Sequence, residues 1–276
     1  MPKSGFLKAA LILGLLFLYV PIVLLVVLSF NENRLVTVWT GFSTKWYGEL
    51  MGNAQLLGAA WLSLKIAFLT ACGAVVLGTL SGLVLARFGP FKGRALFSGM
   101  ISAPLVMPEV ILGLSLLLLF VSLEQLIGWP AGRGVTTIIL AHITFTMAFV
   151  SVVIQSRLVT MDASLEEAAM DLGARPGKVF FVITLPIIAP AIVSGWLLAF
   201  TLSLDDLVIT SFVSGPGSTT LPVEVFSSVR LGVNPQINAL ATIVVGVVAT
   251  GILLATLWTR RQEKQRRQDE RLAQGQ

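Results

Sequence analysis

Long runs without charged residues are the feature that most limits what this chain can fold into. A helix needs about 20 apolar residues to cross the hydrocarbon core of a bilayer. Six stretches approach or exceed that length, namely residues 9–31, 66–86, 95–123, 134–156, 187–206 and 236–259. The third is interrupted only by Glu109, and the fifth ends on Asp205 and Asp206. The pattern predicts an all-α polytopic membrane protein, with residues 1–276 as a single domain of six transmembrane helices.

Composition and charge placement agree with this interpretation. Charged residues make up 12% of the chain, against about 25% in soluble domains. The net charge of +5 does not indicate nucleic-acid binding, because the basic residues flank the apolar runs and do not gather among aromatics.

The basic residues also predict the orientation of the chain. Fourteen Lys and Arg residues fall in one set of segments: the N-terminus, residues 87–94, residues 157–178 and the tail 260–276. The other three loops hold four. Because cytoplasmic loops carry the excess of Lys and Arg, we expect a multi-pass membrane protein with both termini and the basic tail in the cytoplasm.

The polar stretch 161–186 carries its own folding signals. Ser164 followed by Glu167 predicts a capping box, and Gly173 is a suitable residue to end a helix. Pro176 then favours the start of a second helix. We therefore expect a short helix at about 165–172, and because such a helix is poorly stable alone, we expect it to dock on another protein.

Three carboxylates stand where charge is expensive. Glu109 lies about 15 residues into the third run, roughly 20 Å across the membrane at 1.5 Å per residue. Asp205 and Asp206 lie at the far end of the fifth run. A charge within a bilayer is costly and usually functional, and serial carboxylates suit a cationic substrate. The sequence therefore predicts a cation path along these residues.

Structural alternatives remain open for each of these groups. Glu109 could be protonated or paired with Lys65. Asp205 or Asp206 could cap a helix end, and only one of the two can face a path, because a helix turns about 100° per residue. His142, the sole histidine, has no acidic neighbour in sequence and is expected to be a neutral helix contact.

Catalytic motifs are lacking. Residues 173–179 are one residue short of a phosphate-binding G-x-x-x-x-G-K-[ST] loop and end in Val179. No His/Cys cluster has metal-ligand spacing, and no nucleophile–base arrangement occurs. We expect a chain that is not an enzyme and binds no metal or cofactor. Two smaller features are an interfacial helix or partner contact near residues 43–51 and a Gly78-x-x-x-Gly82 packing motif.

The stretch 161–186 also resembles a known loop. Glu167-Ala168-Ala169, three residues, Gly173, nine residues, and Ile183-x-Leu185-Pro186 match the EAA loop of ABC importer membrane subunits. The runs A-P-L-V-M-P-E-V and S-L-D-D-L-V-I-T-S-F-V-S-G-P-G extend the resemblance to permeases of the spermidine/putrescine type. The resemblance implies a type I importer permease fold with a cytoplasmic coupling helix.

The resemblance further implies residue roles and partners. The residues expected to contact an ATPase are Ser164, Leu165, Glu166, Glu167, Ala168, Ala169, Asp171 and Gly173. Glu109, Asp205 and Asp206 stand where polyamine-path acids stand. The implied partners are a second, non-identical permease chain, two ATPase subunits that bind ATP and Mg²⁺, and a periplasmic polyamine-binding protein. The implied location is the cell inner membrane.

Other functions remain open at this point. The chain could be an ABC permease for another small substrate, a secondary transporter or channel, or a membrane-anchored docking subunit without a path of its own. Neither the preference between putrescine and spermidine nor the choice between a homodimeric and a heterodimeric permease follows from the residues.

Overall fold

The computed structural model describes residues 5–34, 38–231 and 234–250. Every regular element of this part is helical, and its isolated extended bridge pairs Asn31 with Phe42. The helices are α1 (Gly5–Leu28), α2 (Lys45–Gly52), α3 (Ala54–Arg87), α4 (Arg94–Val106), α5 (Glu109–Ile127), α6 (Val135–Thr160), α7 (Ser164–Asp171), α8 (Pro176–Val179), the π-helical turn η1 (Phe180–Thr184), α9 (Leu185–Leu204), α10 (Val208–Val213), α11 (Leu221–Leu231) and a helix over Pro235–Thr250. The all-α fold class is confirmed.

Five segments of the described part are long and apolar enough to cross a membrane: α1, α3, α5, α6 and the continuous run Pro176–Leu204. The polytopic character predicted from the charge-free runs is therefore confirmed. The sixth window, 236–259, is described as a helix only to Thr250. The remainder of that window and the basic tail 260–276 lie outside the described residues.

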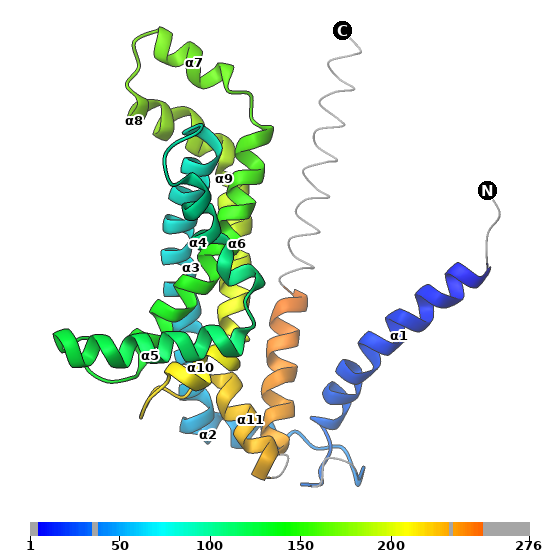
Figure 1. Ribbon diagram of the computed structural model, residues 1–276. Helices are drawn as coiled ribbons and strands as arrows, with labels where there is room; N and C mark the ends of the chain where they lie inside the picture. Colours follow the sequence, from blue (N-terminus) through cyan, green and yellow to red (C-terminus); the bar gives the residue numbers. More distant parts are fainter. Residues whose placement is uncertain (1–4, 35–37, 232–233, 251–276) are drawn as a thin grey trace. The chain divides into compact units, whose positions relative to one another are not determined.

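The third predicted run, residues 95–123, is not one continuous helix in the structure. α4 ends at Val106, the backbone is extended at Met107 and Pro108, and a new helix begins at Glu109. Proline lacks an N–H and disfavours the helical conformation of the residue before it. The thirteen residues of α4 cover about 20 Å, and Figure 1 shows α5 lying across α6 instead of continuing along it.

The chain forms two compact units, one of residues 1–57 with 227–276 and one of residues 58–226. In the first unit, the indole of Trp46 on α2 is buried and donates to the Asn31 carbonyl over 2.6 Å. The Asn53 side-chain amide donates to Gln236 over 2.6 Å. The helix expected near residues 43–51 is present as α2.

The second unit is built around α6. Glycines of α3 permit a close approach: a Cβ placed on Gly78 would lie 2.6 Å from Cβ of Val150, and one on Gly82 would lie 3.0 Å from the Ser151 carbonyl oxygen. From the other side, Gly195 of α9 faces Val150. The packing role predicted for Gly78 and Gly82 is confirmed, and it suits membrane helices, which associate through close van der Waals contact.

Buried side chains of the second unit form two clusters along α6. One joins α3, α5, α6 and α10 through Ile66, Leu116, Ile138 and Ile209. The other joins α3, α6 and α9 through residues that include Val150. Figure 1 shows α7 and α8 beyond one end of α6 and α9, with α5 and α10 near the opposite end. The unit therefore has two ends, and each carries candidate functional residues.

Candidate functional site: a docking loop and a carboxylate cluster

The start of α7 differs from the predicted capping box. The first helical carbonyl is that of Ala163, which accepts from the amides of Glu166 and Glu167. The Ser164 hydroxyl does not cap the Glu167 amide; instead Asp162 Oδ1 accepts from the Ser164 amide over 3.0 Å. This bond and one from the Ser164 hydroxyl lower the pKa of Asp162. The box prediction is wrong because the helix begins one residue earlier than its pattern assumes.

The end of α7 agrees with the sequence. Gly173 has φ +85°, a conformation that other L-residues rarely adopt. Its amide donates to the Met170 carbonyl over 2.8 Å, and the Ala174 amide donates to the Ala169 carbonyl over 3.0 Å. These two bonds form a Schellman motif, which satisfies carbonyls at the helix end. Pro176 then opens α8, as expected.

One side of α7 is tied to the transmembrane body. Arg87 Nε, at the end of α3, lies 2.7 Å from Glu166 Oε2. The buried Thr184 hydroxyl, in η1, donates to Glu166 Oε1. Arg87 also donates to the Met161 carbonyl over 3.4 Å. Glu166 therefore joins α7 to α3 and to the π-helical turn that leads into α9, and its carboxylate is turned away from the exposed face.

The other side of α7 is open. Leu172, which directly follows α7, is 91% exposed, so this apolar side chain is open to solvent. Of the eight residues expected to contact an ATPase, Glu166 and Ala169 are partly buried, and the exposed ones are Ser164, Leu165, Glu167, Ala168, Asp171 and Gly173. A shallow hollow at the end of the helix is lined by Ala169, Leu172, Gly173, Ala174, Arg175 and Lys178. The loop thus offers a mixed apolar and charged surface that can receive a protein partner.

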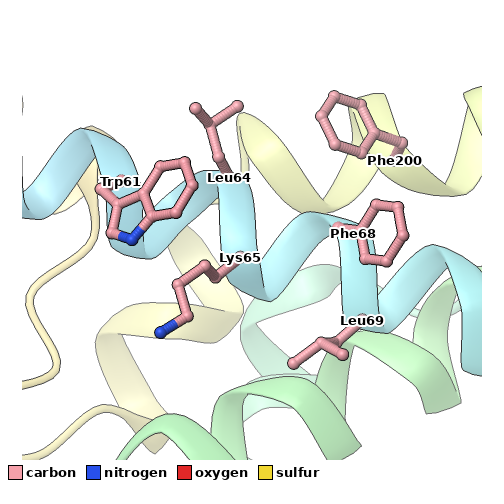
Figure 2. A pocket seen from close by; sticks show the side chains of 6 residues that line it. All are labelled: Trp61, Leu64, Lys65, Phe68, Leu69 and Phe200. Atoms are coloured by element: carbon pink, nitrogen blue, oxygen red, sulfur yellow. The ribbon is translucent and has the colours of Figure 1, made fainter.

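At the opposite end, Glu109 is exposed in the first turn of α5. The unpaired amides of a helix N-terminus favour a negative charge there. The alternative pairing with Lys65 does not form, since no ion pair joins the two among the described residues. Instead, Lys65 lines an apolar hollow on α3 and α9 together with Trp61, Leu64, Phe68, Leu69 and Phe200 (Figure 2).

Asp205 and Asp206 have different surroundings. Asp205 follows the last residue of α9, and its side chain is exposed. Asp206 is buried, and its two oxygens accept from the backbone amides of Ile209 (3.2 Å) and Thr210 (2.7 Å). The Asp206 carboxylate therefore caps α10, which is one of the structural roles left open above.

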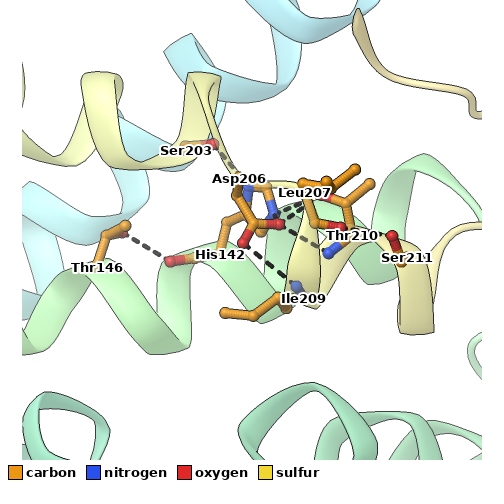
Figure 3. A network of polar contacts seen from close by, with 8 residues as sticks. All are labelled: His142, Thr146, Ser203, Asp206, Leu207, Ile209, Thr210 and Ser211. Atoms are coloured by element: carbon orange, nitrogen blue, oxygen red, sulfur yellow. Dashed lines mark hydrogen bonds and ion pairs between the residues drawn. The ribbon is translucent and has the colours of Figure 1, made fainter. Parts of the chain in front are cut away.

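The buried carboxylate of Asp206 also meets His142. Nε2 of His142 lies 3.1 Å from Asp206 Oδ2 and 3.0 Å from the Thr210 hydroxyl, while Nδ1 lies 2.7 Å from the Ser203 hydroxyl. Figure 3 shows these side chains converging from α6, from the end of α9 and from the start of α10. Sequence reasoning missed this cluster, although polar groups within apolar runs tend to pair with one another.

Comparisons with known proteins agree with the resemblance to importer permeases. Residues 74–268 match the family model described as binding-protein-dependent transport system inner membrane component. The putrescine transport system permease protein PotI of Escherichia coli strain K12 is 63% identical, over 94% of this chain and 92% of its own length. The spermidine/putrescine transport system permease protein PotC of the same strain is 40% identical, over 90% and 91%.

Among solved structures, the fold is similar to a bacterial ABC transporter involved in the import of the acidic polysaccharide alginate. The TM-score is 0.72 with 20% identity, over 93% of this chain and 94% of that one. At that identity the likeness concerns the fold alone, and it agrees with the importer-permease architecture.

Proposed function

The chain belongs to the family of binding-protein-dependent transport system inner membrane components, and we propose that it is a permease subunit of an ATP-driven polyamine importer. The observation that carries the proposal is the 63% identity to a putrescine permease over 94% of the chain. The docking loop and the exposed carboxylates at the opposite end of the same helical unit are the two features that such a subunit needs.

The exposed face of α7 is the docking surface for an ATPase in this proposal. The loop's fixed end at Gly173 and its bond to the body through Glu166 support the assignment, because force applied to α7 would pass directly to α3 and α9. ATP and Mg²⁺ are assigned to the ATPase partner. The chain itself acts as a transport subunit and not as an enzyme.

Glu109 and Asp205 are the proposed path carboxylates. Both are exposed within the second unit, so both are free to meet a substrate that carries two or more positive charges. A carboxylate replaces part of the water that a cation loses on entry, and several weak sites in series allow the cation to leave again. Asp206, whose oxygens are already bonded, is less suited to direct contact.

The proposed partners are a second permease chain, a pair of ATPase subunits and an external polyamine-binding protein. The family's dependence on a binding protein supports the last of these. One chain supplies one docking loop, so a pair of ATPase subunits requires a second permease. The excess of basic residues beside α7 and the termini supports a cytoplasmic location for all three in the proposed complex.

The orientation is tested by cysteine labelling in a Cys72→Ala background. A cysteine at Ser164 should react with a membrane-impermeant reagent only from the cytoplasmic side, and one at Thr44 only from outside. Both positions are exposed in the structure. Reaction of the two variants from the same side would refute the proposed topology.

The transport proposal is tested in vesicles that contain the copurified complex and its binding protein. We expect ATP-dependent uptake of labelled putrescine or spermidine and none of a neutral sugar of similar size. Uptake that persists without ATP under an ion gradient would instead identify a secondary transporter. Equal uptake of the neutral control would refute the polyamine assignment.

A further inference from the structure

The cluster around His142 satisfies every one of its polar side-chain atoms with a single assignment of protons. Nε2–H of His142 donates to the Asp206 carboxylate, and the Thr210 hydroxyl donates to the same oxygen over 2.7 Å. The Ser203 hydroxyl donates to Nδ1, which is an acceptor in this neutral tautomer. A buried carboxylate that receives four such bonds is held firmly, because losing any one leaves a costly unsatisfied group.

The cluster also fixes the direction in which the chain leaves α9. The Asp205 amide closes the helix by donating to the Thr201 carbonyl over 3.2 Å, and the next residue turns inward to His142. Asp205 is therefore held between a helix end and an anchored neighbour. Its exposed carboxylate points outward because the side chain that follows it is bonded inside the protein.

Asp206 is also linked, through α10, to α5, the helix that carries Glu109. Asp206 caps α10, and α10 packs on α5: a Cβ placed on Gly113 would lie 2.7 Å from the ring of Phe212 and 3.3 Å from Cα of Ile209. Gly113 stands one turn after Glu109 on α5. The His142–Asp206 contact is thus linked to both proposed path carboxylates: to Asp205 through the chain, and to Glu109 through α10 and α5.

We propose that His142 is a positioning residue for substrate passage, which acts through Asp206 to orient the exposed Asp205 carboxylate. The inference rests on the proposed function. His142 does not touch the substrate in this arrangement. It holds Asp206 inside the protein, so that Asp205 presents its charge to a passing cation in one fixed direction.

Two substitutions of similar polarity separate this role from simple packing. In His142→Gln, the side-chain amide reaches roughly the position of Nε2 and can still donate to Asp206. In His142→Asn, the amide reaches only the position of Nδ1 and can bond to Ser203 but not to Asp206. The measurement is the initial rate of ATP-dependent putrescine uptake per assembled complex, with ATP hydrolysis recorded in parallel.

We expect His142→Asn to lower the uptake rate about tenfold and His142→Gln to stay within about threefold of the wild type. Both should yield normal amounts of complex and normal basal ATP hydrolysis. Thr146→Val is the matched control, because within the described residues the Thr146 hydroxyl donates to the His142 carbonyl, over 2.7 Å, one turn away on α6. It should transport like the wild type.

The dependence on Asp205 comes from a double-mutant cycle. If His142 acts through Asp205, His142→Asn should reduce uptake by less than about twofold when Asp205→Asn is already present. A full tenfold loss in that background would overturn the inference, as would equal transport by the Gln and Asn variants. If Asp205→Asn alone transports like the wild type, Asp205 is not part of the path and the positioning role is overturned with it, whereas ATP-dependent putrescine uptake by the wild-type complex tests the proposed function separately.

Discussion

The two ends of the α6–α9 body reach their geometry in different ways. At the docking loop, α7 is defined by neighbours in sequence: Asp162 at its start and Gly173 at its end. At the opposite end, Asp206 accepts from its sequence neighbours Ile209 and Thr210 and also from His142, which lies 64 positions earlier in the chain. The first arrangement is local, whereas the second adds to its local bonds a contact that exists only after α6 has packed against the end of α9.

The difference has a functional meaning. A loop that must be recognised by a separate protein benefits from a shape that depends little on the rest of the fold. A carboxylate that is proposed to meet a substrate benefits from being held by several packed helices. The twenty residues of α9, about 30 Å long, connect the two ends directly. The experiments below compare the effects of substitutions at the two ends.

The largest effect is expected at Gly173. Gly173→Val places a β-branched residue in a left-handed conformation that costs about 1–2 kcal/mol and breaks the Schellman motif. We expect the complex to lose its ATPase subunits and all transport, with normal membrane insertion, as measured by pull-down of the ATPase. Gly177→Val, four residues on and without positive φ, is the control. ATPase recovery equal for the two variants would contradict the importance of the loop's own geometry.

A large effect is also expected at Glu109. Attraction between a carboxylate and a cation in a low-dielectric passage reaches a few kcal/mol, and about 1.4 kcal/mol corresponds to a tenfold change in rate. Glu109→Gln should therefore cut polyamine uptake at least about tenfold while ATPase retention is unchanged, and Glu109→Asp should be milder. Glu124→Gln, near the other end of α5, is the control. Wild-type transport by Glu109→Gln would show that this carboxylate is structural.

An intermediate effect is expected where the docking loop meets the body. Arg87 and Glu166 form a partly buried pair, with side chains 20% and 14% exposed, and removing one partner leaves the other with a desolvation cost of about 1–3 kcal/mol. Arg87→Met should weaken ATPase retention several-fold, whereas the exposed Arg157→Met should not. The exchange Arg87→Glu with Glu166→Arg should recover part of the loss; no recovery would argue against the pair itself.

The smallest effect distinguishes the observed helix start from the predicted capping box. Asp162→Ala removes the acceptor of the Ser164 amide, whereas Ser164→Ala removes a hydroxyl that caps no later amide. Hydrogen exchange of the α7 amides should therefore quicken more in the Asp162 variant. The pKa of Asp162 is lowered in the folded chain. Its contribution to the stability of the α7 start is therefore present above the ordinary Asp pKa and is lost as the pH falls through the pKa of the folded state. Faster hydrogen exchange in the Ser164 variant would instead support the capping box that the sequence predicts at Ser164.

Local signals account for what could be predicted. The charge-free runs predicted the apolar helices because a helix satisfies its backbone polar groups within one segment, as lipid requires. Gly173 and Pro176 gave the ends of the docking helices because few residues suit a positive φ or a first helical turn. The same local reasoning failed at Ser164, where one residue of shift in the helix start separates two plausible caps.

What the sequence by itself determined was the helical membrane class and the end of α7 at Gly173, because hydropathy and turn chemistry act over a few neighbours. The contact between Asp206 and another transmembrane helix was decided only by the tertiary structure. Local bonds to Ile209 and Thr210 already make Asp206 a helix cap. His142 adds a buried donor from α6, and that donor arrives only when α6 packs against the end of α9.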